Sequence, residues 1–291
     1  MGKHQGYGVM NVVGVQTLLP YGIVMACMVL LLSLFRLRKS LLGRLSVKGI
    51  SIGNGQTMGR REEQDDYFST ATTLNGTIAV LADGISGLSN GRMASTIAVT
   101  TFIRQFLKVE KIQQIPAFFT KSARLSNQEI LEQLRGSRGG TTLVAAVITQ
   151  GNLYWGAVGD SILMVYRNGD FIQMNSKDTY ELILEQRYLA GQITRADAIS
   201  DPQKKRLINY LGFEGFRNME VCREPYRLQK GDKVILCSDG VYETLTEIEI
   251  ERILTQSRST QDAAQAIIEA VEHKNKKNQD NATVVILENG W

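Results

Sequence analysis

The chain has 291 residues, 43% of them hydrophobic and 21% charged, a composition that excludes wholesale disorder and supplies a core of full size. Three widely spaced cysteines exclude a disulfide framework, and two histidines, His4 and His273, make zinc or histidine-based catalysis a poor candidate. The first 48 residues hold six basic and no acidic residues. Residues 49–291 therefore hold 27 of the 33 basic residues and all 29 acidic ones. This balance argues against nucleic-acid binding by residues 49–291.

The first segment of the chain has the pattern of a membrane anchor. After a tail at residues 1–10, residues 11–35 carry no charge, which is long enough to cross a bilayer core of ~30 Å as one helix. Pro20 would kink this helix or mark its start. Residues 36–48 are a basic juxtamembrane segment, so we expect a single-pass protein of the cell membrane with its C-terminal bulk in the cytoplasm. A cleaved signal peptide fits poorly because the charge follows the apolar run, and a buried core helix is the other alternative.

Residues 49–291 are predicted to form one domain. Only residues 46–57 suggest a linker, part of which is predicted to be strand already. The pair Asn168-Gly169 between two apolar runs predicts a tight hairpin. Apolar runs that turn residues bound predict strands at residues 77–82, 141–149, 153–158, 162–167, 233–237 and 283–287.

Helical patterns lie between groups of these strands. Ala94, Ala98, Phe102 and Phe106 are spaced by four and share one face, and residues 178–190 and 261–273 show the same periodicity. Because strands come in consecutive runs, the sequence favours an α+β fold with mostly antiparallel sheets over a doubly wound fold.

Acidic residues recur at the ends of the predicted strands. A carboxylate at the end of an apolar strand is costly to bury unless it is paired or binds a cation. One such residue alone is usually a turn former, but several that converge would repel one another, and a divalent cation with hard oxygen ligands relieves that repulsion. The residues concerned are Asp65, Asp66, Asp83, Asp160, Asp239 and Asp280.

These segments also carry a resemblance. From about residue 50 to 289 the chain resembles the metal-dependent Ser/Thr protein phosphatases of the type 2C (PPM) family, in its bacterial form. The matching segments occur in the family's order: GRREEQDDY (59–67), LADGISG (81–87), GGTTLV (139–144), GDSILMVYRNG (159–169), LCSDGVYETL (236–245) and QDNATVVIL (279–287). The resemblance implies a β-sandwich of two antiparallel sheets flanked by helices, with the metals at one end, and residues 178–213 resemble the helix and flap of bacterial members.

The resemblance also implies roles for individual residues. Asp83 is expected to bridge two Mn²⁺ or Mg²⁺ ions, and Gly84 to offer its backbone carbonyl to one of them. Asp239 and Asp280 complete this pair of sites. Asp65, with Gln64 beside it, is expected to bind a metal directly or through water. Asp160 matches a ligand of a third, weaker metal site.

An arginine is expected to hold the substrate phosphate. The resemblance gives this role to Arg60, five residues before Asp65, and the planar donors of arginine suit a bidentate phosphate clamp. Arg61 is the rival for the role, and a solvated turn beside Glu62 and Glu63 is the structural alternative for both arginines.

The mechanism implied by the resemblance needs no nucleophilic side chain, because a water between two metals is ionised near neutral pH and attacks phosphorus in line. Many family members carry a histidine directly after the Asp-Gly pair, whereas this chain has Ile85. Protonation of the leaving group is then left to water at the metals. Ile162 replaces an arginine of the family's pattern, which predicts a packing change and no lost ligand.

We therefore predict a phosphoprotein phosphatase that acts on phosphoserine and phosphothreonine, opposed to a Ser/Thr kinase, and that binds no nucleic acid. Two alternatives remain open from the sequence. One is a non-catalytic phosphoprotein-binding module on the same fold, against which the complete set of aspartates argues. The other is a phosphatase of another phosphomonoester.

Overall fold

The computed structural model describes residues 24–36, 49–85 and 90–290. The chain forms two compact units, Met1–Ser46 and Val47–Trp291. In the first unit, residues 24–36 form a helix with exposed apolar side chains. No helix within the described residues has both the length and the apolar character needed to cross a bilayer. The predicted tail at 1–10, residues 11–23 of the predicted anchor and residues 37–48 of the basic segment lie outside the described residues.

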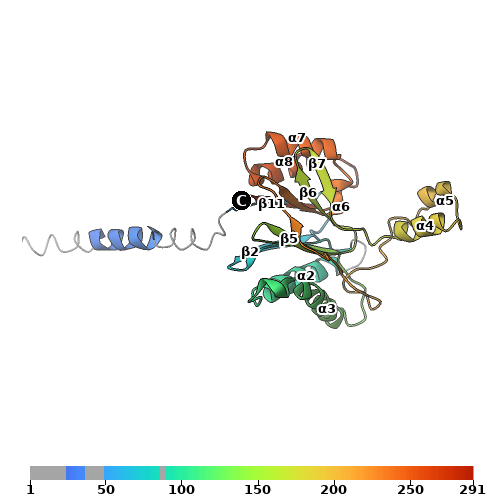
Figure 1. The fold of residues 1–291 in the computed structure, drawn as a ribbon, viewed down its shortest axis with the longest axis horizontal. Helices are drawn as coiled ribbons and strands as arrows, with labels where there is room; N and C mark the ends of the chain where they lie inside the picture. Colours follow the sequence, from blue (N-terminus) through green and yellow to red (C-terminus); the bar gives the residue numbers. More distant parts are fainter. Residues whose placement is uncertain (1–23, 37–48, 86–89, 291) are drawn as a thin grey trace, which may run out of the picture. The chain divides into compact units, whose positions relative to one another are not determined.

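The second unit contains two antiparallel sheets (Figure 1). The first sheet has the strand order β1-β11-β10-β6-β7, and the second has the order β2-β3-β4-β5-β8, with β9 also paired to β5. The strands of the first sheet are β1 (Ile50–Thr57), β6 (Ile162–Arg167), β7 (Asp170–Gln173), β10 (Lys233–Cys237) and β11 (Ala282–Asn289). Those of the second are β2 (Tyr67–Thr73), β3 (Gly76–Ala82), β4 (Leu143–Thr149), β5 (Asn152–Val158), β8 (Glu220–Val221) and β9 (Tyr226–Arg227).

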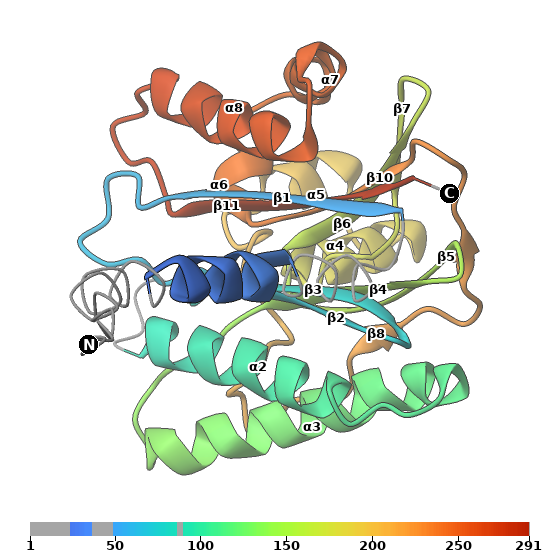
Figure 2. The same ribbon diagram turned by 90° about the vertical axis from the view of Figure 1, so that its left-hand side faces the viewer.

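Helices cover the outer face of each sheet (Figure 2). Helices α2 (Gly91–Phe106) and α3 (Ile115–Leu134) pack on the second sheet, the latter preceded by a short 3-10 turn, Ile112–Gln114. Helices α7 (Glu247–Gln256) and α8 (Thr260–His273) pack on the first sheet, after the short α6 (Asp239–Tyr242). Helices α4 (Tyr180–Leu189) and α5 (Arg195–Ser200) contact each other and project from the sandwich in Figure 1.

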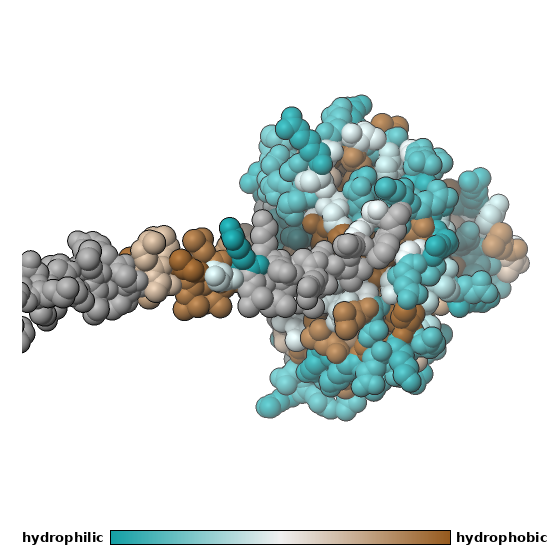
Figure 3. Space-filling view, turned by 60° about the vertical axis from the view of Figure 1, so that its left-hand side comes forward, coloured by the Kyte–Doolittle hydropathy of each residue, from teal (hydrophilic) through white to brown (hydrophobic). Residues whose placement is uncertain are grey.

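The sandwich has three apolar layers, and the strands alternate between them. In β3, Ile78, Val80 and Ala82 face the helix layer, whereas Ala79 and Leu81 face the space between the sheets. Both faces of β3 are therefore covered, which explains why all seven of its residues are buried and why its sequence reads as an uninterrupted apolar run. The surface of this unit that faces the viewer in Figure 3 is mostly hydrophilic, whereas the helix at residues 24–36 is largely hydrophobic.

The α+β prediction with two antiparallel sheets and flanking helices is confirmed. The predicted hairpin is present, with Asn168 and Gly169 at φ 51° and 97° between β6 and β7. The expectation that part of residues 46–57 is strand is confirmed, because β1 pairs with β11 over eight positions from Ile50↔Asn289 to Thr57↔Ala282. Helix α3, which the sequence analysis did not predict, is the longest helix of this unit among the described residues.

Candidate active site

The strand pairing brings the acidic residues to one end of the sandwich. In the second sheet, β2 begins directly after Asp66 and β3 ends directly before Asp83, and their antiparallel register places these ends side by side. In the first sheet, β10 ends just before Asp239 and β11 begins just after Asp280, and these ends are paired as well. Asp160 lies in the short connection that carries the chain from β5 of one sheet to β6 of the other.

Asp83 lies at the centre of this cluster. Burial raises the pKa of the Asp83 carboxyl well above its usual value, and the negative charges of four neighbouring aspartates, Asp66, Asp239, Asp160 and Asp280, raise it further. The backbone around Asp83 is fixed, because its carbonyl oxygen accepts from the Thr141 hydroxyl at 2.8 Å and from the Thr142 amide at 2.9 Å. The four acids that the sequence analysis placed at strand ends in LADG, GDS, SDG and QDN are therefore close enough to repel one another.

Asp66 is the acidic residue for which the sequence analysis proposed no metal role. Its side chain is 2% exposed, and one carboxylate oxygen, Oδ2, accepts from the Ser238 hydroxyl at 2.8 Å and from the Thr283 hydroxyl at 2.7 Å. The other oxygen, Oδ1, is buried without a donor when both carboxyls are ionised, whereas a protonated Asp83 can donate to the Asp66 carboxylate. Burial raises the pKa of Asp66 to about 6, against which the two hydroxyl donors act. A buried carboxylate oxygen without a donor is unfavourable unless a cation contacts it.

The carboxylate of Asp65 has a different environment. Burial raises the pKa of Asp65, and a hydrogen bond from the backbone amide of Arg92, in the first turn of α2, acts against this shift. The backbone amide of Asp65 donates to Asn281 Oδ1 at 2.8 Å, and its carbonyl oxygen accepts from Ser95 at 2.6 Å. The role of Asp65 as a metal ligand stays a prediction, and the geometry favours Asp66, one residue further along, as the carboxylate that faces the cluster.

Gly84 lies where α2 and the Asp65 segment approach most closely. Its amide donates to the Asp65 carbonyl oxygen at 3.2 Å. A Cβ at this position would lie 2.5 Å from the carbonyl carbon of Gly91 and 2.8 Å from the Asp65 carbonyl oxygen. Glycine is thus required here by close backbone packing, independently of the metal contact that the resemblance implies for its own carbonyl.

Asp239 and Asp160 lie on the side of the cluster nearest α6. Burial, and then the charges of Asp160 and Asp280, raise the pKa of Asp239 to about 7. Burial also raises the pKa of Asp160, which Lys177 opposes. The Lys177 ammonium lies 3.7 Å from the centre of the Tyr242 ring, and the Tyr242 hydroxyl donates to the Asp160 carbonyl oxygen at 3.1 Å.

The two candidate phosphate-binding arginines point in different directions. The Arg61 guanidinium donates to Asp280 Oδ2 at 2.6 Å and so contacts the acidic cluster. The Arg60 guanidinium donates to Asn275 Oδ1 at 2.6 Å. Arg61 is therefore better placed than Arg60 to meet a phosphate at the cluster. A hollow of about 110 Å³ adjoins this region, lined by Asp239, Gly240, Glu243, Thr244, Lys276, Asn278, Gln279 and Asp280.

The donor set of the cluster suits a divalent cation. Within the described residues, no three acidic, histidine or cysteine side chains form a ready-made metal site. The partnerless Oδ1 of Asp66 and the repulsion that raises the pKa of Asp83 are nevertheless features that a cation would relieve. All the donors are carboxylate or backbone oxygens, which favour Mg²⁺ or Mn²⁺ over softer metals.

Comparison with known proteins agrees with this arrangement. Residues 57–282 match the family model described as protein phosphatase 2C. A serine/threonine phosphatase of Listeria monocytogenes serotype 4b is 28% identical over 236 residues, which cover 79% of this chain and 91% of that protein. Protein phosphatase PhpP of Streptococcus pneumoniae is 26% identical over 234 residues, which cover 78% of this chain and 92% of that protein.

Solved structures show the same fold. The serine/threonine phosphatase of S. agalactiae superposes with a TM-score of 0.72 at 26% identity, covering 82% of this chain and 99% of that one. The catalytic domain of the phosphatase PstP, solved with two manganese ions, superposes with a TM-score of 0.68 at 22% identity, covering 84% of this chain and 99% of that one. With the family model matched across the sandwich and its acidic cluster, this chain belongs to the protein phosphatase 2C family.

Proposed function

We propose that this chain removes phosphate from serine and threonine side chains of proteins at the acidic cluster around Asp83. As a member of the protein phosphatase 2C family, the chain is a serine/threonine protein phosphatase. One observation carries the assignment of the site. The Oδ1 atom of Asp66 is buried without a hydrogen-bond donor, and it lies in a cluster where four aspartates surround the carboxyl of Asp83. Two other functions were left open by the sequence, a non-catalytic binding module and a phosphatase of small metabolites. Neither has comparable support.

We propose Mn²⁺ or Mg²⁺ as the cofactor, held by Asp66, Asp83, Asp239 and Asp280, with Asp65 as the weaker candidate. The carbonyl of Gly84 is a further candidate ligand, and Asp160 would hold a third ion. When bound, such ions supply an activated water and neutralise charge on the phosphoryl oxygens. The structural relative PstP was solved with two manganese ions. Calorimetric titration of Mn²⁺ tests the assignment without an activity assay, because Asp66→Asn should weaken binding and Asp65→Asn should weaken it much less.

The chain's own residues orient the substrate. Arg61 exchanges its bond with Asp280 for one with the incoming phosphate, and its planar donors fix two phosphoryl oxygens. Hydrogen bonds from Thr141 and Thr142 fix the backbone at Asp83 and so keep the acidic cluster in place while the phosphate ester is hydrolysed. Ile85 at the end of this segment offers no proton, so the leaving oxygen takes its proton from water.

Two arginine variants separate substrate capture from metal binding. Arg61→Ala removes a charge-assisted donor and should raise KM, and it should lower kcat as well if the contact tightens in the transition state. Arg60→Ala, the matched control, should have a much smaller effect because Arg60 bonds to Asn275. Substrate titrations at saturating Mn²⁺ measure both. A large KM effect confined to Arg60→Ala would instead support the assignment made from the sequence.

We also propose a single-pass location in the cell membrane, with residues 11–35 as the anchor and the catalytic domain in the cytoplasm. The support is the charge-free run followed by the basic residues Arg36, Arg38 and Lys39. The partner would be a Ser/Thr kinase acting on the same phosphoproteins. Membrane fractionation of the full chain and of a chain beginning at Ser46 tests the location: only the full chain should sediment with membranes.

A further inference from the structure

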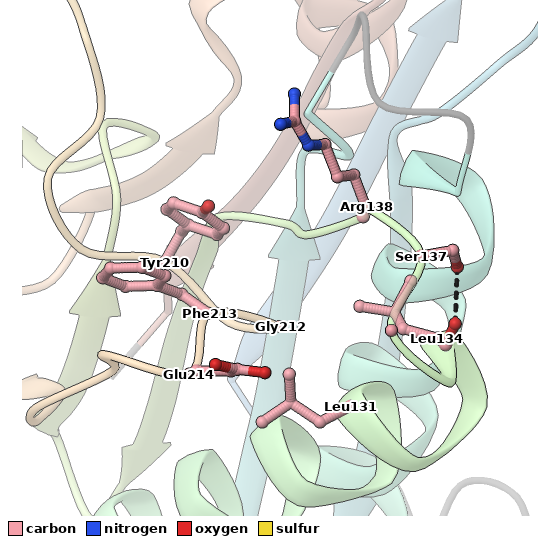
Figure 4. Close-up of a pocket in the computed structure, with 10 residues that line it drawn as sticks. Leu131, Leu134, Ser137, Arg138, Tyr210, Gly212, Phe213 and Glu214 are labelled. Carbon is pink, nitrogen blue, oxygen red and sulfur yellow. Dashed lines mark hydrogen bonds between the residues drawn. The ribbon is translucent and has the colours of Figure 1, made fainter.

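A second cavity, with a volume of about 570 Å³, lies between the C-terminal part of α3 and residues 210–214 (Figure 4). In Figure 4 the rings of Tyr210 and Phe213 line one side and Leu131 and Leu134 the other, while Arg138 rises from its upper edge. The two rings are stacked with their centres 5.1 Å apart. The volume is that of a site for a small ligand or for one or two side chains of a peptide.

The cavity is built by close packing of glycines. A Cβ on Gly140 would lie 2.6 Å from the Tyr210 ring, and a Cβ on Gly212 would lie 2.8 Å from Ile130 and 2.9 Å from the Gly139 carbonyl oxygen. The Gly212 amide also donates to Asn127 of α3 at 2.7 Å. The walls are therefore fixed by the backbone, and the hollow is preformed.

The segment that precedes β4 connects the cavity to the acidic cluster. Thr141 donates its hydroxyl to the Asp83 carbonyl oxygen, and its backbone exchanges two hydrogen bonds of 2.9 Å with Leu211. Arg138 is only three residues from Thr141, a span of at most about 10 Å of extended chain. A protein segment whose phosphorylated residue lies at the cluster would therefore reach the cavity within a few residues.

The chemistry of the cavity matches a peptide with an apolar and an acidic residue. Phe213 is 37% exposed although it is a large aromatic side chain, and such partly exposed aromatics are typical anchor points of interfaces. Arg138 is exposed, and no hydrogen bond or ion pair reaches its guanidinium from any residue in the described parts of the chain. Glu214 also lines the cavity, next to Phe213, so an anionic group on the occupant is favoured only at the edge formed by Arg138.

We propose that this cavity is a substrate-docking site that selects phosphoproteins carrying an apolar side chain, bound between Phe213 and Leu131, next to an acidic residue bound by Arg138. The inference rests on the proposed function, because it assigns the cavity to the same protein substrates. It adds a specificity determinant outside the residues that hold metal or phosphate.

The test compares peptides with a substrate too small to reach the cavity. Phosphothreonine peptides, in which an apolar–acidic pair is moved stepwise along each side of the phosphothreonine, are hydrolysed beside p-nitrophenyl phosphate. For the best peptide, Phe213→Ala should raise KM about tenfold and Arg138→Gln about threefold. Neither variant should change kinetics on p-nitrophenyl phosphate. Arg138→Glu should reverse the preference between the acidic peptide and its lysine counterpart, which loss of structure alone would not do.

Arg217→Gln is the matched control, because Arg217 is exposed in the same segment but does not line the cavity. Equal kinetics of wild type and all variants on every peptide would overturn the docking site and leave the proposed function intact. Parallel losses on peptides and on p-nitrophenyl phosphate would also overturn it, since the residues would then act on the fold. If the wild type hydrolysed p-nitrophenyl phosphate and no phosphopeptide, the proposed function would fall, and the docking site with it.

Discussion

Asp66→Asn should make the metal-free protein more stable while it weakens metal binding. Burial raises the pKa of Asp66 from 3.8 to about 6, so at pH 7 the folded state carries a charge that it disfavours. Each pH unit between the two values is worth about 1.4 kcal/mol, which gives a cost of about 3 kcal/mol. The asparagine removes this charge but satisfies the Ser238 and Thr283 hydroxyls less well, so the net gain should be about 1–3 kcal/mol.

The assay is thermal unfolding in EDTA at pH 7, where the variant should melt about 3–10 °C above the wild type. Because the folded state holds the Asp66 proton to higher pH than the unfolded state, wild-type stability falls as pH rises from 3.8 towards about 6. The advantage of the variant should therefore shrink near pH 4. Saturating Mn²⁺ should stabilise the wild type by about 3 kcal/mol at a hundred times Kd, and the variant by clearly less.

Asp65→Asn is the matched control, because its carboxylate contacts the first turn of α2 and lies outside the buried centre. Because burial and the Arg92 hydrogen bond act on this carboxylate in opposite directions, the stability of this variant in EDTA should change much less than that of Asp66→Asn, and it should keep most of its stabilisation by Mn²⁺. Lower stability of Asp66→Asn than of the wild type in EDTA at pH 7 would refute a disfavoured charge on Asp66. A wild-type response of both variants to Mn²⁺ would refute its role in metal binding.

Three further predictions concern other parts of the domain. EDTA should abolish phosphatase activity, and Asp239→Asn should lower kcat about 10²–10³-fold. Steady-state assays over a series of Mn²⁺ concentrations measure both effects, and full activity in the chelator would contradict the prediction. Asp232→Asn should lower the free energy of unfolding, measured by chemical denaturation, by about 3 kcal/mol. The reason is that Asp232 is 2% exposed and accepts two hydrogen bonds from Arg167, at 2.6 and 2.9 Å. An unchanged denaturation midpoint would contradict this prediction. Hydrogen bonds from Lys274 and Thr246 lower the pKa of Glu249 from 4.5 to about 2, so stability should be lost as pH falls from 4.5 towards 2, and Glu249→Gln should flatten that part of the pH profile.

The sequence predicted the central strands well because both of their faces are buried. In β3 and β11 nearly every residue is buried, and each strand contains an uninterrupted apolar run that marks it in the sequence. Helix α3 gave a weaker signal because its buried face includes Ser122 and Ser126 among the apolar residues, which interrupts the apolar periodicity. The bounds of β1 within residues 46–57 could not be predicted, because Gly53 and Gly55 occupy its interior. Both are needed there, since a Cβ would lie 2.1 Å from the Thr260 carbonyl oxygen and 2.8 Å from α8 atoms.

The acidic cluster could be predicted, but the register of the segment before β2 could not. Consecutive residues at a strand entry point to opposite sides, so a shift of one position exchanges Asp65 with Asp66 and changes which carboxylate is buried. The same applies to Arg60 and Arg61 in the preceding turn. Only the hydrogen bonds from Ser238 and Thr283 to Asp66 identify the inward residue, and both donors come from segments far away in the sequence. The two consecutive acidic residues, Asp65 and Asp66, were the one signal in the sequence that either could face the cluster.

The pairing of β1 with β11 affects how the protein is made. Ile50 lies opposite Asn289, and β11 is flanked on its other side by β10, so this sheet stays split until the last strand has left the ribosome. Contacts of such long sequence separation form slowly, and β1 and β10 leave unpaired edges in the meantime, which are prone to aggregation. Asp280 lies just before β11 and is therefore synthesised almost at the same time as this strand. A nascent chain that still lacks Asp280 and β11 is therefore expected to be inactive, and its incomplete sheet would be a target for chaperones and proteases.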